Sequence, residues 1–232
     1  MILKKIFNCV LIFLISFSIF SCSHNTSTEI SLPSSTTSES SRQKILALHG
    51  GGELPQDFQN QAGMQSLMSA LPNVTFVFAD APEPGNVWIK DPPGGKNQPT
   101  TDRPWADNSI DYLDQFVIDN GPFDIILGYS QGCAMALLYL SRSSTTFNKV
   151  LLFNGYRPTT HYGLNSTISE SAPFTIPSFI FGGQQDPFYF GVSELQVLFE
   201  NPNILTSSLA NHHLPFSTDP TFQEVVNFII EN

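Results

Sequence analysis

Residues 121–132 have the sequence Gly-Pro-Phe-Asp-Ile-Ile-Leu-Gly-Tyr-Ser-Gln-Gly, and this stretch decides the fold of the chain. The apolar run Asp124–Leu127 predicts a short buried strand, and the Ala- and Leu-rich residues 133–140 predict a helix after it. Between the two, residues 128–132 match the G-x-S-x-G turn, which holds a serine hydroxyl above the edge of a sheet. Glycine is required at both ends of this turn because a side chain there would collide with neighbouring backbone. Ser130 is therefore the candidate nucleophile.

Strand-like and helix-like segments alternate along the rest of the chain. Short apolar runs predict further strands at Lys44–Leu48, Val74–Phe78, Val150–Phe153, Ser178–Phe181 and Ile204–Ser207. Apolar residues at helical spacing predict helices near residues 64–71, 110–117, 192–199 and 222–230. Short, continuously apolar strands alternating with helices indicate a parallel sheet covered on both faces. We expect an α/β protein of the α/β-hydrolase fold, with a mostly parallel central sheet and helices on both faces. The order of the strands cannot be read from the sequence.

A serine hydroxyl needs a base to take its proton, and the base needs an acid to orient it. Hydrolases with this turn carry the three groups in the order Ser, Asp, His. Asp186 lies in a turn directly after the predicted strand at 178–181, where its carboxylate would orient an imidazole. His212 and His213 both follow the last predicted strand, and we expect one of them to be the base and the other a solvated loop residue.

Two backbone N–H groups are expected to stabilise the oxyanion of the transition state. His49-Gly50-Gly51-Gly52 ends the first strand, where this fold places one donor, and the residue after the nucleophile gives the other. We expect Gly51 and Gln131 as the two donors, with Gly52 as the alternative to Gly51. His49 is expected to have a structural role.

A long Pro- and Gly-rich stretch, residues 82–104, carries Trp88. Loops of this length inside a compact domain are usually functional, so we expect this one to border the acyl pocket. Trp88 is predicted to contact a lipophilic substrate group, together with Tyr129 beside the nucleophile. The alternative is that Trp88 only pins the loop to the core.

The sequence resembles a known family, the FSH family of serine hydrolases. The resemblance is carried by residues 121–132, Leu48-His49-Gly50, Asp80-Ala81-Pro82, Trp88, the turn from Gly182 to Asp186, and the His-x-x-Pro segment at 212–215. It implies a small α/β-hydrolase that cleaves esters or acyl-thioesters through an acyl-enzyme intermediate. It also implies Ser130 as nucleophile, Asp186 as acid and His212, three residues before Pro215, as base.

The amino-acid composition argues against two other classes of protein. Apolar residues make up 41% of the chain and charged residues only 13%, which argues against a disordered protein. The net charge of −10 disfavours nucleic-acid binding. His212-His213 has no metal-ligand spacing, so we expect no metal and no cofactor.

Two alternatives remain, a non-catalytic ligand-binding or scaffolding protein on this fold and a peptidase with the same three residues. The partner is expected to be a small-molecule ester or thioester, and the oligomeric state cannot be read.

The N-terminal segment predicts export. Lys4 and Lys5 precede the apolar run Val10–Phe20, which is too short to span a bilayer and is typical of a signal peptide. Cys22 follows in a sequence that resembles a bacterial lipobox. We predict a signal peptide at 1–21, a Ser/Thr-rich tether at 22–42 and a hydrolase domain at 43–232. The protein is then secreted or in the cell envelope, with a possible membrane tether through Cys22; the alternative is an ordinary signal peptide with an incidental Cys.

The mature N-terminus tests this prediction. If the host is bacterial, mass spectrometry of the mature protein should find diacylglyceryl-Cys22 as the first residue. A free N-terminus at another residue contradicts the lipid anchor.

Overall fold

The central sheet contains six strands, all parallel to their neighbours. The computed structural model describes residues 42–96 and 98–231. The strands are β1 (Lys44–Leu48), β2 (Thr75–Ala79), β3 (Ile125–Tyr129), β4 (Lys149–Phe153), β5 (Ser178–Gly183) and β6 (Asn203–Ser207). Their order in the sheet is β2-β1-β3-β4-β5-β6.

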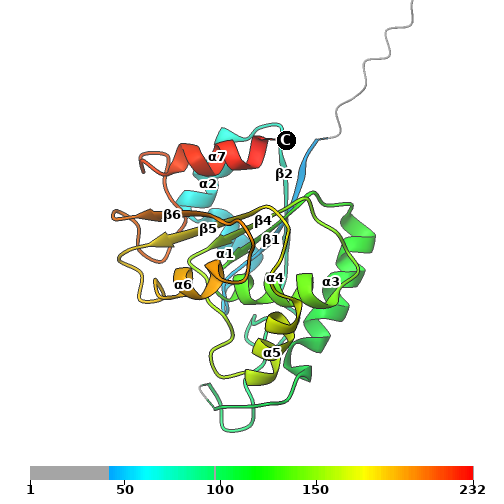
Figure 1. Cartoon of the computed structure of the whole chain (residues 1–232). Coiled ribbons are helices and arrows are strands. Elements are labelled where there is room, and N and C mark those ends of the chain that lie inside the picture. The colour runs from blue at the N-terminus through cyan, green and yellow to red at the C-terminus, as the bar shows by residue number, and fades with distance from the viewer. Residues whose placement is uncertain (1–41, 97, 232) are drawn as a thin grey trace, which may run out of the picture. The chain divides into compact units, whose positions relative to one another are not determined.

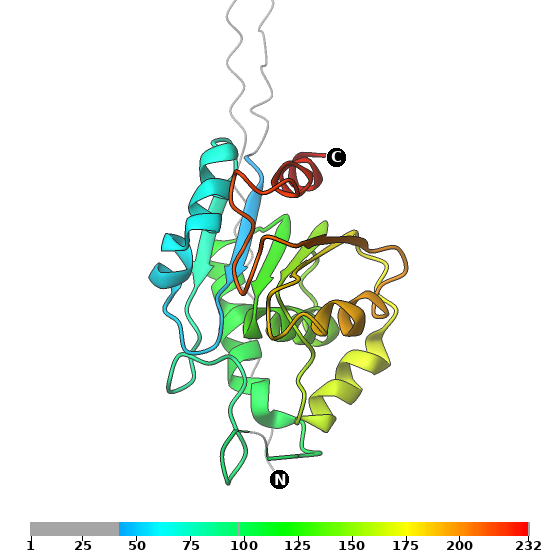
Figure 2. The ribbon, with the colours of Figure 1, turned by 90° about the vertical axis from the view of Figure 1, so that its left-hand side faces the viewer.

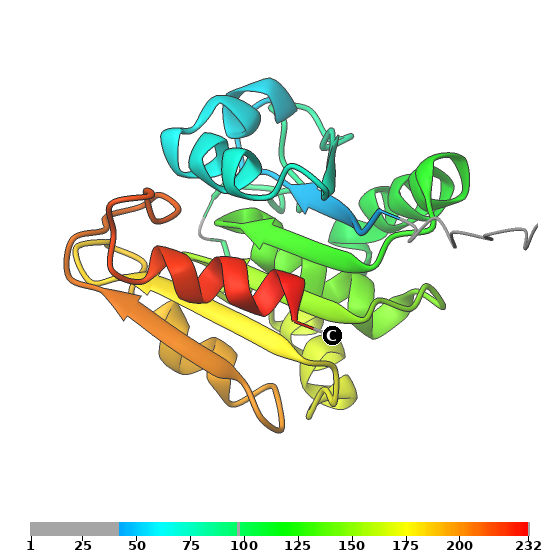
Figure 3. The same cartoon turned by 90° about the horizontal axis from the view of Figure 1, so that it is seen from above.

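Helices cover both faces of this sheet (Figure 1). They are α1 (Pro55–Asn60), α2 (Ala62–Ala70), α3 (Asp107–Asn120), α4 (Gln131–Arg142), α5 (Tyr162–Ser171), α6 (Gly191–Gln196) and α7 (Phe222–Ile230), with a 3₁₀ turn at Pro104–Ala106. In Figure 3, seen from above, α7 (red) lies over the sheet and runs along its strands, and Figure 2 shows α2 and α7 above the helices of the opposite face.

Side chains alternate along the strands between two apolar clusters, one on each face. In β1, Leu46 and Leu48 belong to the cluster that includes residues of α3, α4 and α5, whereas Ile45 and Ala47 belong to the cluster with α1, α2 and α7. All four side chains are fully buried. Burial on both faces explains why the strands appear in the sequence as unbroken apolar runs.

The topology places all the functional loops at one edge. The first strand, β1, is second from one edge of the sheet; the chain then goes to the edge strand β2, crosses back to β3 beside β1, and continues through β4 and β5 to β6. The carboxyl ends of parallel strands share one edge. The connections that leave neighbouring strands β1 and β3 run in opposite directions there, which is where ligands generally bind in open α/β sheets. The loop after β1 begins at His49, and the turn after β3 carries Ser130.

All six predicted strands are present, with ends that differ by at most two residues. Two helices, α1 and α5, were not predicted. The sequence Pro-Gln-Asp-Phe-Gln-Asn of α1 has one apolar side chain, Phe58, and the Ser- and Thr-rich α5 has only Leu164 and Ile168 fully buried among its non-glycine residues. Neither has enough apolar residues to show a helical period, because each packs on the core through one or two side chains.

The predicted signal peptide and all but the last residue of the predicted tether lie outside the described residues, and both stay predictions. Within the described part of the chain, no helix has both the length and the apolar character needed to cross a bilayer.

Candidate active site

The turn between β3 and α4 holds Ser130 in a conformation that side chains rarely adopt, with φ of 53°. A Cβ added at Gly128 would lie 2.6 Å from the Gly132 carbonyl oxygen, and one added at Gly132 would lie 2.2 Å from the Leu48 carbonyl oxygen. Both positions therefore require glycine, as the sequence pattern predicts. The N–H of Ser130 donates to the Phe153 carbonyl at the end of β4, which fixes the turn against the next strand.

Ser130, His212 and Asp186 form one hydrogen-bonded row. The imidazole Nδ1–H of His212 donates to Asp186 Oδ2 at 2.7 Å, and its Nε2 accepts from the Ser130 hydroxyl at 3.0 Å. The Asp186 side chain is fully buried, and its other oxygen accepts from the Phe188 N–H at 2.8 Å. Because a carboxylate can only accept, it fixes the proton of His212 on Nδ1 and leaves Nε2 free to take a proton from the hydroxyl.

The choice between the two histidines rests on their contacts. The His213 ring is bound to its own loop, with Nδ1 donating to the Leu214 carbonyl at 2.8 Å and Nε2 accepting from the Asn211 N–H at 3.3 Å. It stacks on Phe216 with ring centres 4.4 Å apart. Of the two, only His212 reaches both Ser130 and Asp186.

Two aromatic rings hold the His212 imidazole in place. The rings of Tyr129 and Phe188 lie 5.1 Å and 5.2 Å from it, centre to centre. The Tyr129 hydroxyl also donates to the His212 backbone carbonyl at 2.8 Å. These contacts restrict both the ring and the loop that carries it.

Asn154, directly after β4, ties two of the functional loops together. Its amide oxygen accepts from the Gly183 N–H at 2.7 Å, and its amide nitrogen donates to the His213 carbonyl at 2.8 Å. The side chain is buried and the residue has φ of 48°, a conformation in which Asn is several-fold enriched. Asn154 thereby fixes the end of β5, where the Asp186 turn begins, to the loop of His212.

The loop after β1 carries three consecutive glycines, and two of their N–H groups are bonded. The N–H of Gly50 donates to Glu53 Oε2, and the N–H of Gly52 donates to the Asn86 carbonyl. Of the three glycines, Gly51 is the one whose N–H has no acceptor among the described residues. A Cβ at Gly51 would lie 3.0 Å from Cδ of Gln131, so the two expected oxyanion donors belong to adjoining residues.

The structure corrects the roles expected for Trp88 and Tyr129. Trp88 is fully buried, and its indole N–H donates to the His49 carbonyl at 2.9 Å. Its backbone N–H donates to Gln131 Oε1 at 2.7 Å. Tyr129 is 3% exposed and faces His212. Neither side chain is placed to meet a substrate. Trp88 pins the long loop to the core, which was the alternative to substrate contact, and Tyr129 supports the histidine loop.

The His49 side chain links the loop after β1 to the residues after β2. Its Nε2 accepts from the Ala81 N–H, so the proton is on Nδ1, which donates to the Gly50 carbonyl at 2.7 Å. The ring is fully buried, and burial lowers the pKa of His49. A neutral His49 thus joins the ends of β1 and β2.

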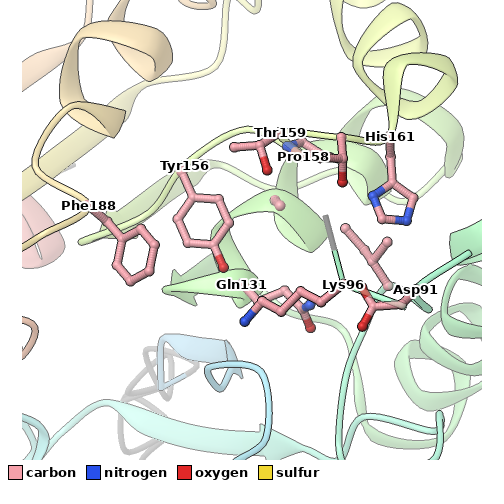
Figure 4. Close-up of a pocket in the computed structure, with 11 residues that line it drawn as sticks. Asp91, Lys96, Gln131, Tyr156, Pro158, Thr159, His161 and Phe188 are labelled. Atoms are coloured by element: carbon pink, nitrogen blue, oxygen red, sulfur yellow. The ribbon is translucent and has the colours of Figure 1, made fainter. Parts of the chain in front are cut away.

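A pocket of about 150 Å³ is lined by neighbours of the hydrogen-bonded row, since Gln131 follows Ser130 and Phe188 packs against His212. The long loop does border it, through Ile89, Asp91 and Lys96, and the remaining wall includes Tyr156 and Phe188 (Figure 4). Tyr156 stacks on Phe188 with ring centres 4.9 Å apart. Burial raises the pKa of the Tyr156 phenol, and the neighbouring Ser130 hydroxyl opposes this shift.

Asn154, Tyr156, Phe188 and Lys96 were not identified from the sequence. The first three lie within five residues of the carboxyl end of β4 or β5, so inspecting the residues directly after each predicted strand could have identified them. Lys96 does not directly follow a predicted strand, so its position in the sequence does not mark it. Among the described residues, no three His, Cys, Asp or Glu side chains gather as a metal site would require.

The chain resembles known proteins in sequence. The sequence model of a family described as serine hydrolase (FSH1) matches residues 38–223. A protein named esterase FUS5, from Gibberella moniliformis, is 30% identical over 206 residues, covering 78% of this chain and 84% of that protein. A protein named family of serine hydrolases 2, from Saccharomyces cerevisiae, is 40% identical over 82 residues, 32% of each chain.

Solved structures show the same fold. Esterase PE8 superimposes with a TM-score of 0.56 at 18% identity, covering 82% of this chain and 92% of that one. SOBER1 from Arabidopsis thaliana gives a TM-score of 0.56 at 20% identity, covering 81% of this chain and 97% of that one. The predicted α/β-hydrolase fold is confirmed.

The support that Tyr129 gives to His212 can be tested by removing one oxygen atom. Tyr129→Phe should lower kcat about tenfold with little change in KM, because a displacement of 1 Å in a catalytic group can cost about 10²-fold. Tyr139→Phe is the matched control, since that hydroxyl donates to Asp114 at 2.9 Å, away from the row of Ser130, His212 and Asp186. The control should lose stability without losing kcat. Equal effects on kcat in the two variants would contradict the positioning role.

Proposed function

This chain belongs to the serine hydrolase (FSH1) family and is an esterase-type enzyme, and we propose that it cleaves carboxylic esters and acyl-thioesters through an acyl-Ser130 intermediate. The observation that carries the proposal is the pair of hydrogen bonds that joins Ser130 to His212 at 3.0 Å and His212 to Asp186 at 2.7 Å. A small-molecule ester is the substrate, as membership of the family indicates.

In the first half of the reaction, Ser130 Oγ attacks the carbonyl carbon of the substrate while His212 Nε2 takes the hydroxyl proton. Asp186 stays ionised, orients the ring through Nδ1–H and stabilises the imidazolium that forms. The carbonyl oxygen becomes an oxyanion, for which the N–H groups of Gly51 and Gln131 are the donors. His212 then gives its proton to the departing alkoxide or thiolate, which leaves the acyl group on Ser130.

In the second half, water replaces the leaving group. The water oxygen attacks the acyl carbon while His212 takes a proton from the water. His212 then returns that proton to Ser130 Oγ when the carboxylic acid departs. The same residues handle an ester and a thioester, because the two substrates differ only in the atom that leaves. Ser130, His212 and Asp186 are all present and hydrogen-bonded in a row, which supports an enzyme over a non-catalytic binding or scaffolding protein.

The two neighbouring histidines provide a matched test of this mechanism. His212→Ala should reduce kcat/KM for an ester by roughly 10³–10⁶-fold, the size of triad removals. His213→Ala should reduce it about tenfold or less, since its ring bonds only within its own loop and a loop shift of less than 1 Å is the expected effect.

Measuring kcat/KM of both variants on one p-nitrophenyl ester decides the assignment. If His213→Ala is the inactive variant, the base is misassigned. If both variants keep nearly full activity, the proposed mechanism is wrong. Parallel assays with an acyl-thioester and an amide of the same acid establish the range of leaving groups.

A further inference from the structure

The pocket beside Ser130 is more polar than a lipophilic acyl chain requires. Figure 4 shows Lys96 and Asp91 on one side and Tyr156 and Phe188 on the other, with Gln131 between them. Thr159 and Thr160 add two hydroxyl groups to the wall. Most of these side chains can donate a hydrogen bond, and one of them carries a positive charge.

The pocket is also small. Its volume of about 150 Å³ compares with that of cavities that hold one benzene ring, roughly six heavy atoms. An acyl group of four carbons with two terminal heavy atoms fits such a space.

Lys96 differs from most of the other cations in this acidic chain. Eight Lys and Arg residues fall in the described part of the chain. Six of them bond to a carboxylate, an amide or carbonyl groups, namely Lys44, Lys90, Arg103, Arg142, Lys149 and Arg157. Among the described residues, Lys96 and Arg42 have no such partner. Arg42 precedes β1 at the amino end of the sheet, whereas Lys96 lines the pocket.

Other charged and titratable groups near the pocket leave the Lys96 ammonium available. Asp91 lines the same pocket, but no ion pair within 4.0 Å joins it to Lys96 among the described residues. The His161 ring faces the pocket, and its Nε2 is bonded to the Lys90 carbonyl at 2.8 Å. Asp91 repels an anion, so an anionic group is favoured where Lys96 and the hydroxyl groups lie.

We propose that this pocket selects short acyl groups that end in a carboxylate, so that the preferred substrates are monoesters or monothioesters of dicarboxylic acids of about four carbons. The Lys96 ammonium pairs with the carboxylate and the hydroxyl groups of Tyr156 and Thr159 donate to it. The ester carbonyl then lies at Ser130. This inference rests on the proposed function, because it assigns the acyl side of the same reaction.

Two esters of the same shape test the inference. Monoethyl succinate and ethyl 4-methylpentanoate differ in having a carboxylate or an isopropyl group at the far end of the acyl chain. The wild-type protein should show a kcat/KM about fivefold higher for monoethyl succinate, because Lys96 is exposed and an exposed ion pair contributes up to about this factor.

Variants then assign the preference to Lys96. Lys96→Met should lower kcat/KM for monoethyl succinate until the preference over the neutral ester is lost, and Lys96→Arg should retain the preference. Arg42→Met is the matched control, since it removes one positive charge far from the pocket and should retain the preference.

The outcomes separate this inference from the proposed function. Hydrolysis of the neutral ester that is lost in Ser130→Ala supports the proposed function independently of Lys96. With that rate measured, equal kcat/KM for the two esters in the wild type overturns the inference, and so does a preference that survives Lys96→Met. If the wild type hydrolyses neither ester, the proposed function fails and the inference fails with it.

Discussion

The close approach of Gly132 to the end of β1 is the contact on which the site depends. A Cβ at this position would lie 2.2 Å from the Leu48 carbonyl oxygen, so α4 can begin there only with glycine. The contact lets the chain turn sharply from β3 into α4 and holds Ser130 at φ of 53°. Such a conformation costs about 1–3 kcal/mol and persists only where the surroundings enforce it. Here β1 lies on one side of the turn, and the hydrogen bond from Ser130 to Phe153 fixes it on the other.

The parallel sheet supplies the rest of the site from its carboxyl edge. Each partner of Ser130 comes from a different strand end, so their alignment depends on links between loops that are distant in sequence. Asn154 bonds both to Gly183 after β5 and to His213 after β6, and Tyr129 bonds to the His212 carbonyl. On the other side of the turn, Gln131 accepts from Trp88, which in turn bonds to His49. Rigid strands with cross-bonded loops thus hold the reacting groups in place.

Local pattern in the sequence was enough to predict the six strands, the glycine-bounded turn and Asp186, whereas the choice of His212 over His213 came from the family resemblance. It was enough because buried parallel strands are continuously apolar and because the order Ser, Asp, His follows from the fold. The strand order and the role of Trp88 depend on tertiary packing. A Trp in a long loop can face the solvent, a ligand or the core, and the sequence does not distinguish these. The role of Asn154 was missed because its partners are backbone atoms 29 and 59 positions away. The short helix α5 was missed because its Ser- and Thr-rich sequence has a low local preference for a helix.

The central claim is that Ser130 forms the covalent intermediate, and labelling with a fluorophosphonate tests it most directly. The reagent traps a serine activated by a neighbouring base, and digestion followed by tandem mass spectrometry identifies the labelled residue. The account predicts one adduct, on Ser130, and loss of both the adduct and ester hydrolysis in Ser130→Ala. An adduct on another residue, or ester hydrolysis at the wild-type rate in Ser130→Ala, would contradict it.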